Sequence, residues 1–146
     1  MKQSGFTLLE VLVALLVMSI GLLGLAGLMA SSMRNNLSAS HRTQAIWQAY
    51  DIVDRMRANR AVAITATGGY VTALGAATCS AAAPTGTVPQ QDIAAWKNQL
   101  ACVLPAGDGS IAVDPATRET TVVIQWNDSR GTQGVANQTF TVNTQL

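Results

Sequence analysis

An uncharged apolar run near the N-terminus constrains this chain more than any other feature. The twenty residues from Val11 to Ala30 read VLVALLVMSIGLLGLAGLMA. A helix rises about 1.5 Å per residue, so this run would extend about 30 Å, the thickness of a bilayer's hydrocarbon core. A secretory signal peptide is the alternative, because the residues around Ala30 loosely match a small-residue cleavage site. Its apolar region would be shorter, about 7–15 residues, so the run favours a membrane-spanning helix.

Glu10 lies inside the apolar N-terminal segment and is the most informative single residue. A carboxylate within a membrane helix costs roughly 2.5–3.5 kcal/mol on insertion scales, which makes it a functional candidate by default. Two interpretations follow. Glu10 either reaches back to the lipid headgroups as an interfacial residue, or it meets a specific cationic partner.

The residues before Glu10 favour a specific partner. Lys2 followed by Gly5-Phe6-Thr7-Leu8-Leu9-Glu10 resembles the N-terminal signal of type IV prepilins and type II secretion pseudopilins. The resemblance covers about the first 30 residues. It implies that a prepilin peptidase cuts between Gly5 and Phe6, that the new amine of Phe6 is N-methylated, and that Glu10 becomes the fifth mature residue. It also implies that Phe6 and Glu10 serve subunit assembly.

The chemistry of these residue types suits that interpretation. Glycine lets a protease approach the backbone closely at Gly5. Cleavage creates a cationic amine at Phe6, which Glu10 of a neighbouring subunit can approach. Two unit charges 4 Å apart attract by about 4 kcal/mol at an effective dielectric of 20, enough to offset a buried carboxylate when the geometry is good. Such a pair would also fix the axial register of apolar helices that could otherwise slide.

Three glycines recur within the apolar run, at Gly21, Gly24 and Gly27. They permit close packing of membrane helices, or they weaken the helix locally by roughly 1 kcal/mol each, so that it bends or unwinds outside the lipid. Both roles remain open. The resemblance adds that major pilins usually carry a proline where this chain has Gly27, which favours a minor subunit.

The helical pattern continues beyond the membrane run, because residues 31–60 contain no proline or glycine. Apolar residues recur there at helical spacing and predict a stripe that packs on a head: Met33, Leu37, Ala45, Ala49, Ile52, Val53 and Met56. Trp47 and Tyr50 lie off this stripe, and face either a neighbouring subunit or the core of the head. We expect His41 to be a surface residue, and Arg55, Arg57 and Arg60 to be solvated cations near the helix C-terminus.

The remaining residues predict a small mixed head. Asp92 to Leu104 has the pattern of a short amphipathic helix that Pro105 ends, and it follows a low-complexity stretch from Ala76 to Pro89. Segments rich in Val, Ile, Thr and aromatic residues predict short antiparallel strands: Tyr70–Leu74, Ser110–Val113, Thr120–Trp126 and Gln138–Thr144. We expect Val122, Ile124 and Trp126, or the alternate set, to face the stalk. The predicted fold class is α+β, a long N-terminal helix packed on a small antiparallel sheet with one extra helix.

The sequence therefore divides into four expected segments. These are a leader (1–5), a transmembrane and filament-core helix (6–30), an amphipathic stalk helix (31–60) and a globular head (61–146).

Cys79 and Cys102 are the only cysteines. With one histidine in the chain, these two cysteines argue against a closed structural zinc site of the usual types. An even pair in a domain outside the cytoplasm predicts a disulfide. It would tie the alanine-rich loop to the second helix and contribute about 3 kcal/mol in the chain-entropy model.

Composition and motifs restrict the function. A net charge of +1 and 12% charged residues argue against a nucleic-acid binder that relies on a basic surface. We find no Ser/His/Asp set, phosphate loop or metal-ligand spacing, so we expect no enzyme activity, cofactor, metal or small-molecule substrate. An adhesive or DNA-uptake subunit remains an alternative, with Arg118 and Arg130 as candidate loop contacts.

Several segments also resemble one minor pilin subfamily, the type IV pilus modification proteins (PilV). They are the apolar run, Asp51 to Asn59 of the stalk, the Trp96 helix and the strand ending at Trp126. This resemblance implies a low-abundance subunit that starts pilus assembly with other minor and major pilins and stays near the tip. It also implies a prepilin peptidase and an inner-membrane assembly platform as partners. The N-terminus would lie in the cytoplasm and the head in the periplasm, before the subunit joins a surface pilus. A minor pseudopilin of type II secretion is the alternative.

Overall fold

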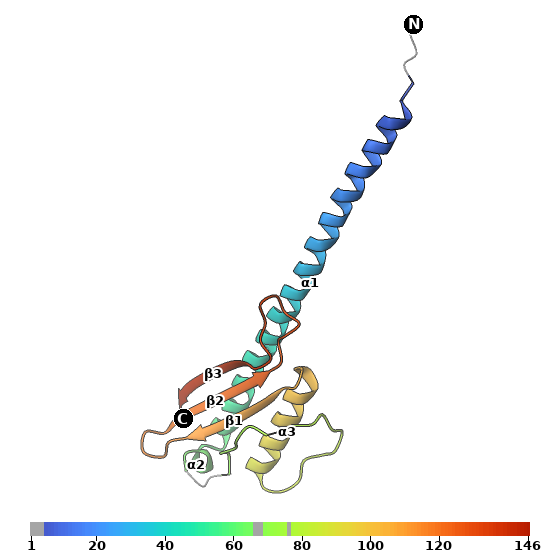
Figure 1. Ribbon diagram of the computed structural model, residues 1–146. Helices are drawn as coiled ribbons and strands as arrows, with labels where there is room; N and C mark the ends of the chain where they lie inside the picture. The colour runs from blue at the N-terminus through green and yellow to red at the C-terminus, as the bar shows by residue number, and fades with distance from the viewer. Residues whose placement is uncertain (1–4, 66–68, 76) are drawn as a thin grey trace.

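The computed structural model describes residues 5–65, 69–75 and 77–146. Its elements are α1 (Leu8–Ala58), α2 (Arg60–Ala63), α3 (Val88–Val103), β1 (Asp108–Val113), β2 (Glu119–Trp126) and β3 (Gln138–Gln145). The first half of α1 projects alone, and its second half lies against the sheet and α3 (Figure 1). The predicted α+β class is confirmed. We call the part of the chain after α1 the head.

Helix α1 forms the stalk. It has 51 residues and is therefore about 75 Å long. It begins at Leu8 rather than Phe6, because Thr7 is extended (φ −81°, ψ 150°) and caps it. It ends at Ala58, where Asn59 leaves the helical conformation (φ −116°, ψ 41°). The glycines of the apolar run do not interrupt it.

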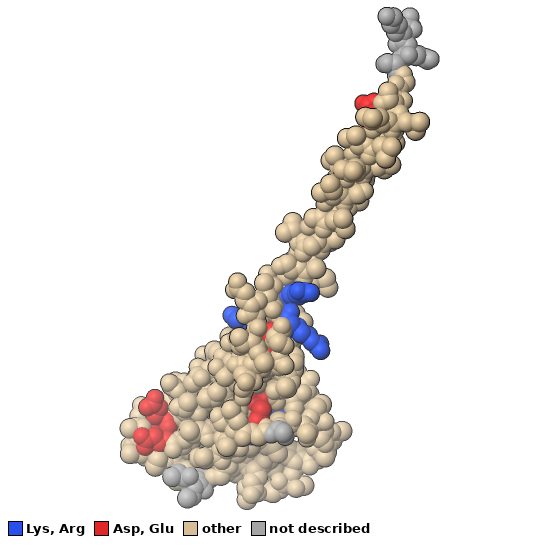
Figure 2. Space-filling view, in the orientation of Figure 1, with Lys and Arg blue, Asp and Glu red and all other residues tan. Residues whose placement is uncertain are grey.

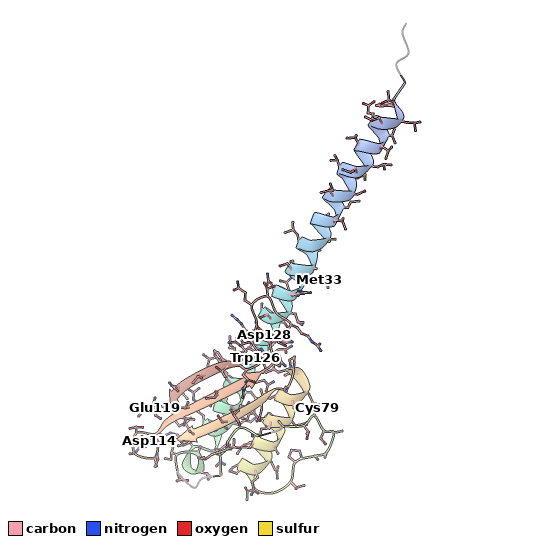
Figure 3. The ribbon with its side chains drawn as sticks, in the orientation of Figure 1. Met33, Cys79, Asp114, Glu119, Trp126 and Asp128 are labelled. Carbon is pink, nitrogen blue, oxygen red and sulfur yellow. A yellow bond between two sulfur atoms is a disulfide. The ribbon has the colours of Figure 1, made fainter. Side chains whose placement is uncertain are left out.

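The apolar stripe of α1 is buried only along its second part. Ala45, Ala49, Ile52, Val53 and Met56 are essentially inaccessible, as predicted. The prediction was wrong for two residues, because Met33 is 72% and Leu37 48% exposed. Met33 lies on α1 before it reaches the head (Figure 3), so no part of the head covers it.

The sheet packs on α1 through one face. Its strand order is β1-β2-β3, and both pairs are antiparallel, with Val122 opposite Ile111 on one side and Val142 on the other. Side chains alternate across a strand, and Val122, Ile124 and Trp126 are the buried set. The first of the two predicted faces is therefore confirmed.

The prediction of a strand at Tyr70–Leu74 was wrong. Within the described residues, this segment forms a single bridge, in which the N–H groups of Thr72 and Ile111 donate to each other's carbonyls at 3.0 and 2.9 Å. The segment thus covers the outer edge of β1 at one position only. Tyr70 beside it is completely buried.

Helix α3 begins at Val88, four residues before the prediction. The Gln90 side-chain oxygen accepts from the Thr87 N–H at 2.9 Å, which satisfies a donor at the helix start. Pro89 lies in the first turn, where its missing N–H costs nothing. Pro89 therefore belongs to α3 and not to the low-complexity stretch. Trp96 and Leu100 of α3 are fully buried, whereas Val103 is 38% exposed.

Candidate assembly site

The candidate assembly site lies at the start of α1, where Thr7 organises the first helical turn. Its hydroxyl oxygen accepts from the Glu10 N–H at 3.3 Å, and its carbonyl accepts from the N–H groups of Glu10 and Val11. Glu10 thus stands at the third helical position, where the positive end of the helix dipole favours a carboxylate. Among the described residues, no side-chain hydrogen bond or ion pair engages that carboxylate, so its acceptor capacity is available to another molecule.

The surface around Glu10 is apolar. Figure 2 shows one acidic spot near the N-terminal end of α1, and the sequence contains no further charge between Glu10 and Arg34. A shallow groove beside Glu10 is lined by Phe6, Val11, Ala14, Leu15 and Met18. In the described residues, α1 is the one helix long and apolar enough to cross a membrane, with a mean hydropathy of 2.6 over 18 residues and none of that window buried. The carboxylate therefore lies in a surface suited to lipid or to other apolar helices.

The glycines of the apolar run have no contact that explains them within the chain. A Cβ atom built at Gly21, Gly24 or Gly27 meets nothing within 4 Å. Packing within the protomer therefore does not require glycine at these positions. The two remaining explanations are close packing against other molecules and bending of α1. Both predicted roles stay open.

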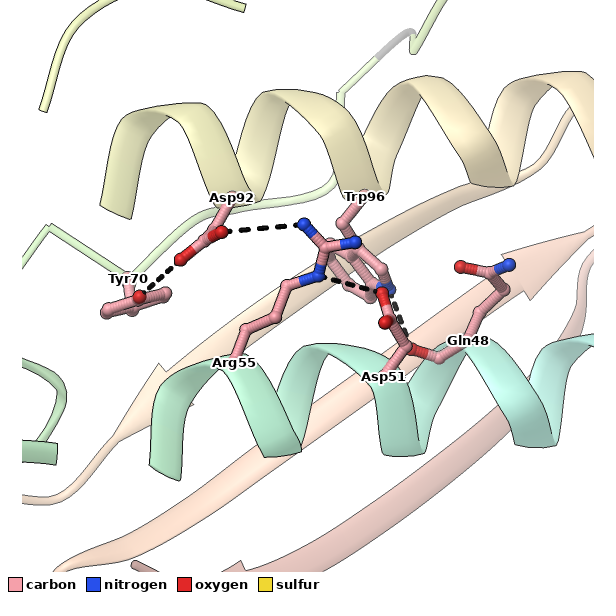
Figure 4. Close-up of polar contacts among 6 residues, drawn as sticks. All are labelled: Gln48, Asp51, Arg55, Tyr70, Asp92 and Trp96. Carbon is pink, nitrogen blue, oxygen red and sulfur yellow. Dashed lines mark hydrogen bonds and ion pairs between the residues drawn. The ribbon is translucent and has the colours of Figure 1, made fainter. Parts of the chain in front are cut away.

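The head is fixed to the stalk by polar contacts at the level of α3 (Figure 4). The indole N–H of Trp96 donates to the Gln48 carbonyl at 2.9 Å. The Arg55 guanidinium bridges two carboxylates, donating to Asp51 at 2.9 Å and to Asp92 at 3.4 Å. The Tyr70 hydroxyl donates to the other oxygen of Asp92 at 2.6 Å. These contacts join α1, α3 and the segment before α3 in one network.

The network changes the proton affinity of two groups. Burial and the hydrogen bond to the Asp92 carboxylate raise the pKa of Tyr70 above its usual value. Burial opposes the charge of Arg55, but hydrogen bonds and attraction from Asp51 and Asp92 outweigh it and raise the pKa of Arg55. Both groups therefore keep their protons at neutral pH.

Of the three arginines near the end of the stalk, Arg57 and Arg60 are exposed to solvent as predicted, whereas Arg55 is half-buried, and all three also bond to groups of the protein. Arg55 bridges two acids as described. Arg57 donates to Asp54 at 3.1 Å and to the Thr144 hydroxyl at 3.3 Å. Arg60 donates to the Leu146 carbonyl at 2.8 Å. Arg55 thus joins the stalk to α3, and Arg57 joins it to the sheet.

A second contact lies at the end of the head nearer the membrane helix, around Asp128 (Figure 3). Asp128 is 2% exposed, and it accepts from the Ser38 hydroxyl at 2.6 Å. Its other oxygen lies 3.8 Å from His41 Nδ1, and the His41 side chain is 13% exposed. The prediction of His41 as a surface residue was therefore wrong. No sequence signal pointed to this contact, because its partners lie 90 residues apart.

Cys79 and Cys102 form a disulfide with their Cα atoms 4.8 Å apart, as predicted. The loop that carries Cys79 is also tied to α3 by Asn98, whose side chain accepts from the Ser80 N–H and donates to the Ser80 carbonyl. The alanine-rich loop is thus fastened along α3.

The two candidate loop arginines do not form one site. Arg118 lies just before β2 and Arg130 lies beyond its other end, so a strand of about 25 Å separates them. Within the described residues, no group of three His, Cys, Asp or Glu side chains is arranged to hold a metal ion.

Comparison with known proteins gives one match. The family model described as the prokaryotic N-terminal methylation motif matches residues 1–26. No curated protein and no solved structure matches the chain. The motif supports a type IV pilin-like or pseudopilin protein of structural rather than catalytic role, and it implies other pilins and a prepilin peptidase as partners. Together with the apolar helix, it is consistent with anchoring in the inner membrane. The N-terminal segment of this chain is thus a type IV pilin-class signal.

Proposed function

We propose that this chain is a minor type IV pilin subunit that takes part in starting pilus assembly and remains near the pilus tip. The observation that carries the proposal is the position of Glu10. It is an acid in the first turn of α1, five residues after Gly5, and the exposed part of the helix from Val11 to Met33 carries no other charge. The methylation motif covers the same residues.

The proposed maturation begins with a prepilin peptidase that hydrolyses the Gly5–Phe6 peptide bond and releases residues 1–5. The amine of Phe6 is then N-methylated and keeps its positive charge. This leaves the cation at residue 6 and the carboxylate at residue 10 of the same subunit. One helical turn separates them, so each can meet its opposite in a neighbouring subunit.

In the assembled filament, the Glu10 carboxylate of one subunit would accept from the Phe6 amine of another. A pair of unit charges about 4 Å apart gains about 4 kcal/mol at an effective dielectric of 20, which offsets the desolvation of the carboxylate. The apolar side chains of α1 replace lipid contacts with contacts to other helices. The charge pair fixes the axial register that apolar packing alone leaves free.

We assign residues 6–30 to the membrane and filament core, residues 31–60 to the stalk and residues 61–146 to a periplasmic head. The N-terminus lies in the cytoplasm before cleavage, and the subunit passes from the inner membrane to the pilus through an assembly platform. Gly27 in place of the usual proline and the PilV-like segments support a minor subunit. A minor pseudopilin of type II secretion would share the N-terminal features.

Replacing Glu10 with alanine tests the proposal. Removal of the buried charge should leave membrane insertion unharmed or slightly improved. Cleavage should continue, because Gly5 and Phe6 are unchanged. Mass spectrometry should find Phe6 with one methyl group at the mature N-terminus of both proteins, but the Glu10→Ala subunit should be absent from sheared filaments. Leu9→Ala is the matched control, since it shortens a neighbouring side chain and keeps the carboxylate.

Two results would overturn the proposal. A mature chain that starts near Ser31 would establish an ordinary signal peptide. Normal recovery of Glu10→Ala in sheared filaments, with a normal number of pili, would show that the carboxylate is an interfacial residue and not an assembly contact.

A further inference from the structure

Arginines gather where α1 enters the head. Figure 2 shows basic side chains at this level, just beyond the uncharged part of the helix. The sequence supplies Arg34 and Arg42 on α1 and Arg130 in the loop between β2 and β3, and all three are exposed. Among the described residues, no side-chain hydrogen bond or ion pair engages their guanidinium groups, whereas Arg55 and Arg57 both pair with acids. These three cations are therefore available to another molecule.

The loop between β2 and β3 is held at this level by its contact with the stalk. Asp128 accepts from the Ser38 hydroxyl at 2.6 Å, and a Cβ atom built at Gly131 would lie 3.1 Å from Ser38 Cβ. Arg130 lies between these two loop residues in the sequence. Ser38 follows Arg34 by about one helical turn. Arg34 and Arg130 therefore lie at nearly the same level of the molecule.

The exposed charge of this region has one sign. Residues 31–50 and 127–137 contain a single acid, Asp128, which is 2% exposed. Two exposed acids, Asp114 and Glu119, lie at the end of the sheet away from the exposed half of α1 (Figure 3). The head thus carries its free arginines toward the apolar helix and these acids away from it.

Exposed apolar side chains accompany the arginines. Met33 is 72% and Leu37 48% exposed, and they lie on either side of Arg34 in the sequence of α1. Val135 is 51% exposed, in the same loop as Arg130. Basic and apolar residues together are what hold protein segments in the interface between lipid headgroups and acyl chains. The composition of this surface therefore suits a membrane interface.

The length of α1 places these residues beside the headgroups. With Ala30 as the end of the hydrocarbon core, Arg34 lies about 6 Å beyond that core, and Ser38, which holds the loop, lies about 12 Å beyond it. The headgroup region on each side of a bilayer is about 5–7.5 Å thick. Long arginine side chains extend their charged ends toward the interface. Lipid phosphates are thus within reach of Arg34 and Arg130.

The same measure sets the limit of the surface along α1. Arg42 lies about 18 Å, Trp47 about 25 Å and Tyr50 about 30 Å beyond Ala30, so the headgroups do not reach them. Trp47 is 68% and Tyr50 54% exposed, and the predicted alternative of head core was therefore wrong for both. Their contact with a neighbouring subunit stays a prediction.

We propose that Met33, Arg34, Leu37, Arg130 and Val135 form a docking surface for the phospholipid headgroups of the leaflet in which α1 ends. We call these five residues the neck surface. Its guanidinium groups donate to lipid phosphates, and anionic headgroups add further attraction. Its apolar side chains enter the boundary between headgroups and acyl chains. The docking holds the basic end of the head against the membrane until the subunit leaves it. This inference rests on the membrane anchoring of α1 in the proposed function.

The test uses the full chain in bilayer nanodiscs, one set of equal parts phosphatidylglycerol and phosphatidylcholine and one of phosphatidylcholine alone. A gadolinium chelate on a small share of the headgroups speeds the nuclear relaxation of nearby methyl groups. We expect strong enhancement at the Val135 methyl groups and background enhancement at Thr117, which lies in the exposed turn between β1 and β2. Discs with the anionic lipid should give the larger effect at Val135.

Substitutions locate the docking. In the anionic discs, Arg34→Gln and Arg130→Gln should each lower the ratio of docked to undocked heads about fivefold, the usual contribution of one arginine near an anionic surface. The double variant should reduce the enhancement at Val135 to background, whereas replacing both arginines with lysine should retain docking. Arg118→Gln, at the far end of the head, and Arg42→Gln, beyond the headgroups, are the matched controls and should dock normally.

The proposal is overturned if Val135 and Thr117 show equal enhancement in the anionic discs, or if the double glutamine variant docks normally with an intact fold by circular dichroism. An equal loss in Arg118→Gln or Arg42→Gln would attribute docking to net charge and would also overturn it. Binding of a DNA duplex through Arg34 and Arg130, without docking on lipid, would reject the lipid partner. A chain that fails to insert into the discs would contradict the proposed anchoring and this inference together, whereas insertion without docking contradicts this inference alone.

Discussion

Gly109 is the position at which a single methyl group should most clearly disturb the head. It is the second residue of β1 and packs against the ring of Trp96. A Cβ atom at this position would stand 2.8 Å from Trp96 Cζ2 and 2.9 Å from Leu100 Cδ1, and closer still to Trp96 Cη2. Ordinary carbon contacts are about 3.5–4.0 Å. Trp96 cannot easily retreat, because its indole N–H is bonded to the Gln48 carbonyl of the stalk.

Gly109→Ala should therefore destabilise the protein by about 1–3 kcal/mol, the usual cost of overpacking a core. Trp96→Phe alone should cost about 2 kcal/mol, since it loses a hydrogen bond and leaves a cavity. Phenylalanine lacks the part of the ring that the new methyl group meets. In the Trp96→Phe background, Gly109→Ala should then cost clearly less, because only the close contact with Leu100 remains, and this gives a favourable coupling of about 1–2 kcal/mol.

The measurement is urea unfolding of the full chain in detergent, followed by near-ultraviolet circular dichroism, with a thermal melt as a second readout. Gly109→Ala should lower the melting temperature by about 4–12 °C. Gly75→Ala is the matched control, because a Cβ atom there meets nothing within 4 Å. The reasoning is refuted if Gly109→Ala is as stable as the unaltered chain, or if its cost is the same with Phe at position 96.

Two further predictions concern the same head. Replacing Cys79 and Cys102 with serine should lower the unfolding free energy by about 3 kcal/mol, the loop-closure value for a separation of 23 residues, and an unchanged urea midpoint would contradict this. The raised pKa of Tyr70 contributes stability that is fully present below about pH 10 and is lost as the pH rises through the higher folded value. Tyr70→Phe should therefore flatten the alkaline fall in unfolding free energy, and identical pH profiles for the two proteins would count against the Asp92 contact.

The sequence predicted those helices and strands in which apolar residues repeat at a regular spacing, because such a repeat places them on one buried face. Val122, Ile124 and Trp126 alternate in one strand, and Ala45, Ala49 and Ile52 recur at helical spacing. Such patterns depend on local geometry alone. The spacing of apolar residues in a helix does not show how much of that helix the rest of the protein covers. Met33 and Leu37 continue the same stripe in the sequence, yet both are exposed in the structure.

The candidate assembly site was predictable because it is a contiguous motif. Gly5, Phe6 and Glu10 lie within six residues, and their spacing alone suggests the chemistry. Contacts between distant segments were not predictable in this way. The bond between Ser38 and Asp128 depends on where the sheet meets the stalk, and that position follows from packing of the whole head.

The contacts between head and stalk connect the candidate assembly site to the orientation of the head. Ser38 holds one end of the head to α1, and Arg57 holds the other through the Thr144 hydroxyl, about 28 Å further along the stalk. Anchored at both ends, the head cannot turn about α1. Its direction in a filament is then fixed by the rotational position of the helix itself. A helix that slips by one residue while keeping the same neighbours turns by about 100°, and the head would turn with it. By fixing the register of α1, the pair between Glu10 and Phe6 would therefore also determine which way the head faces.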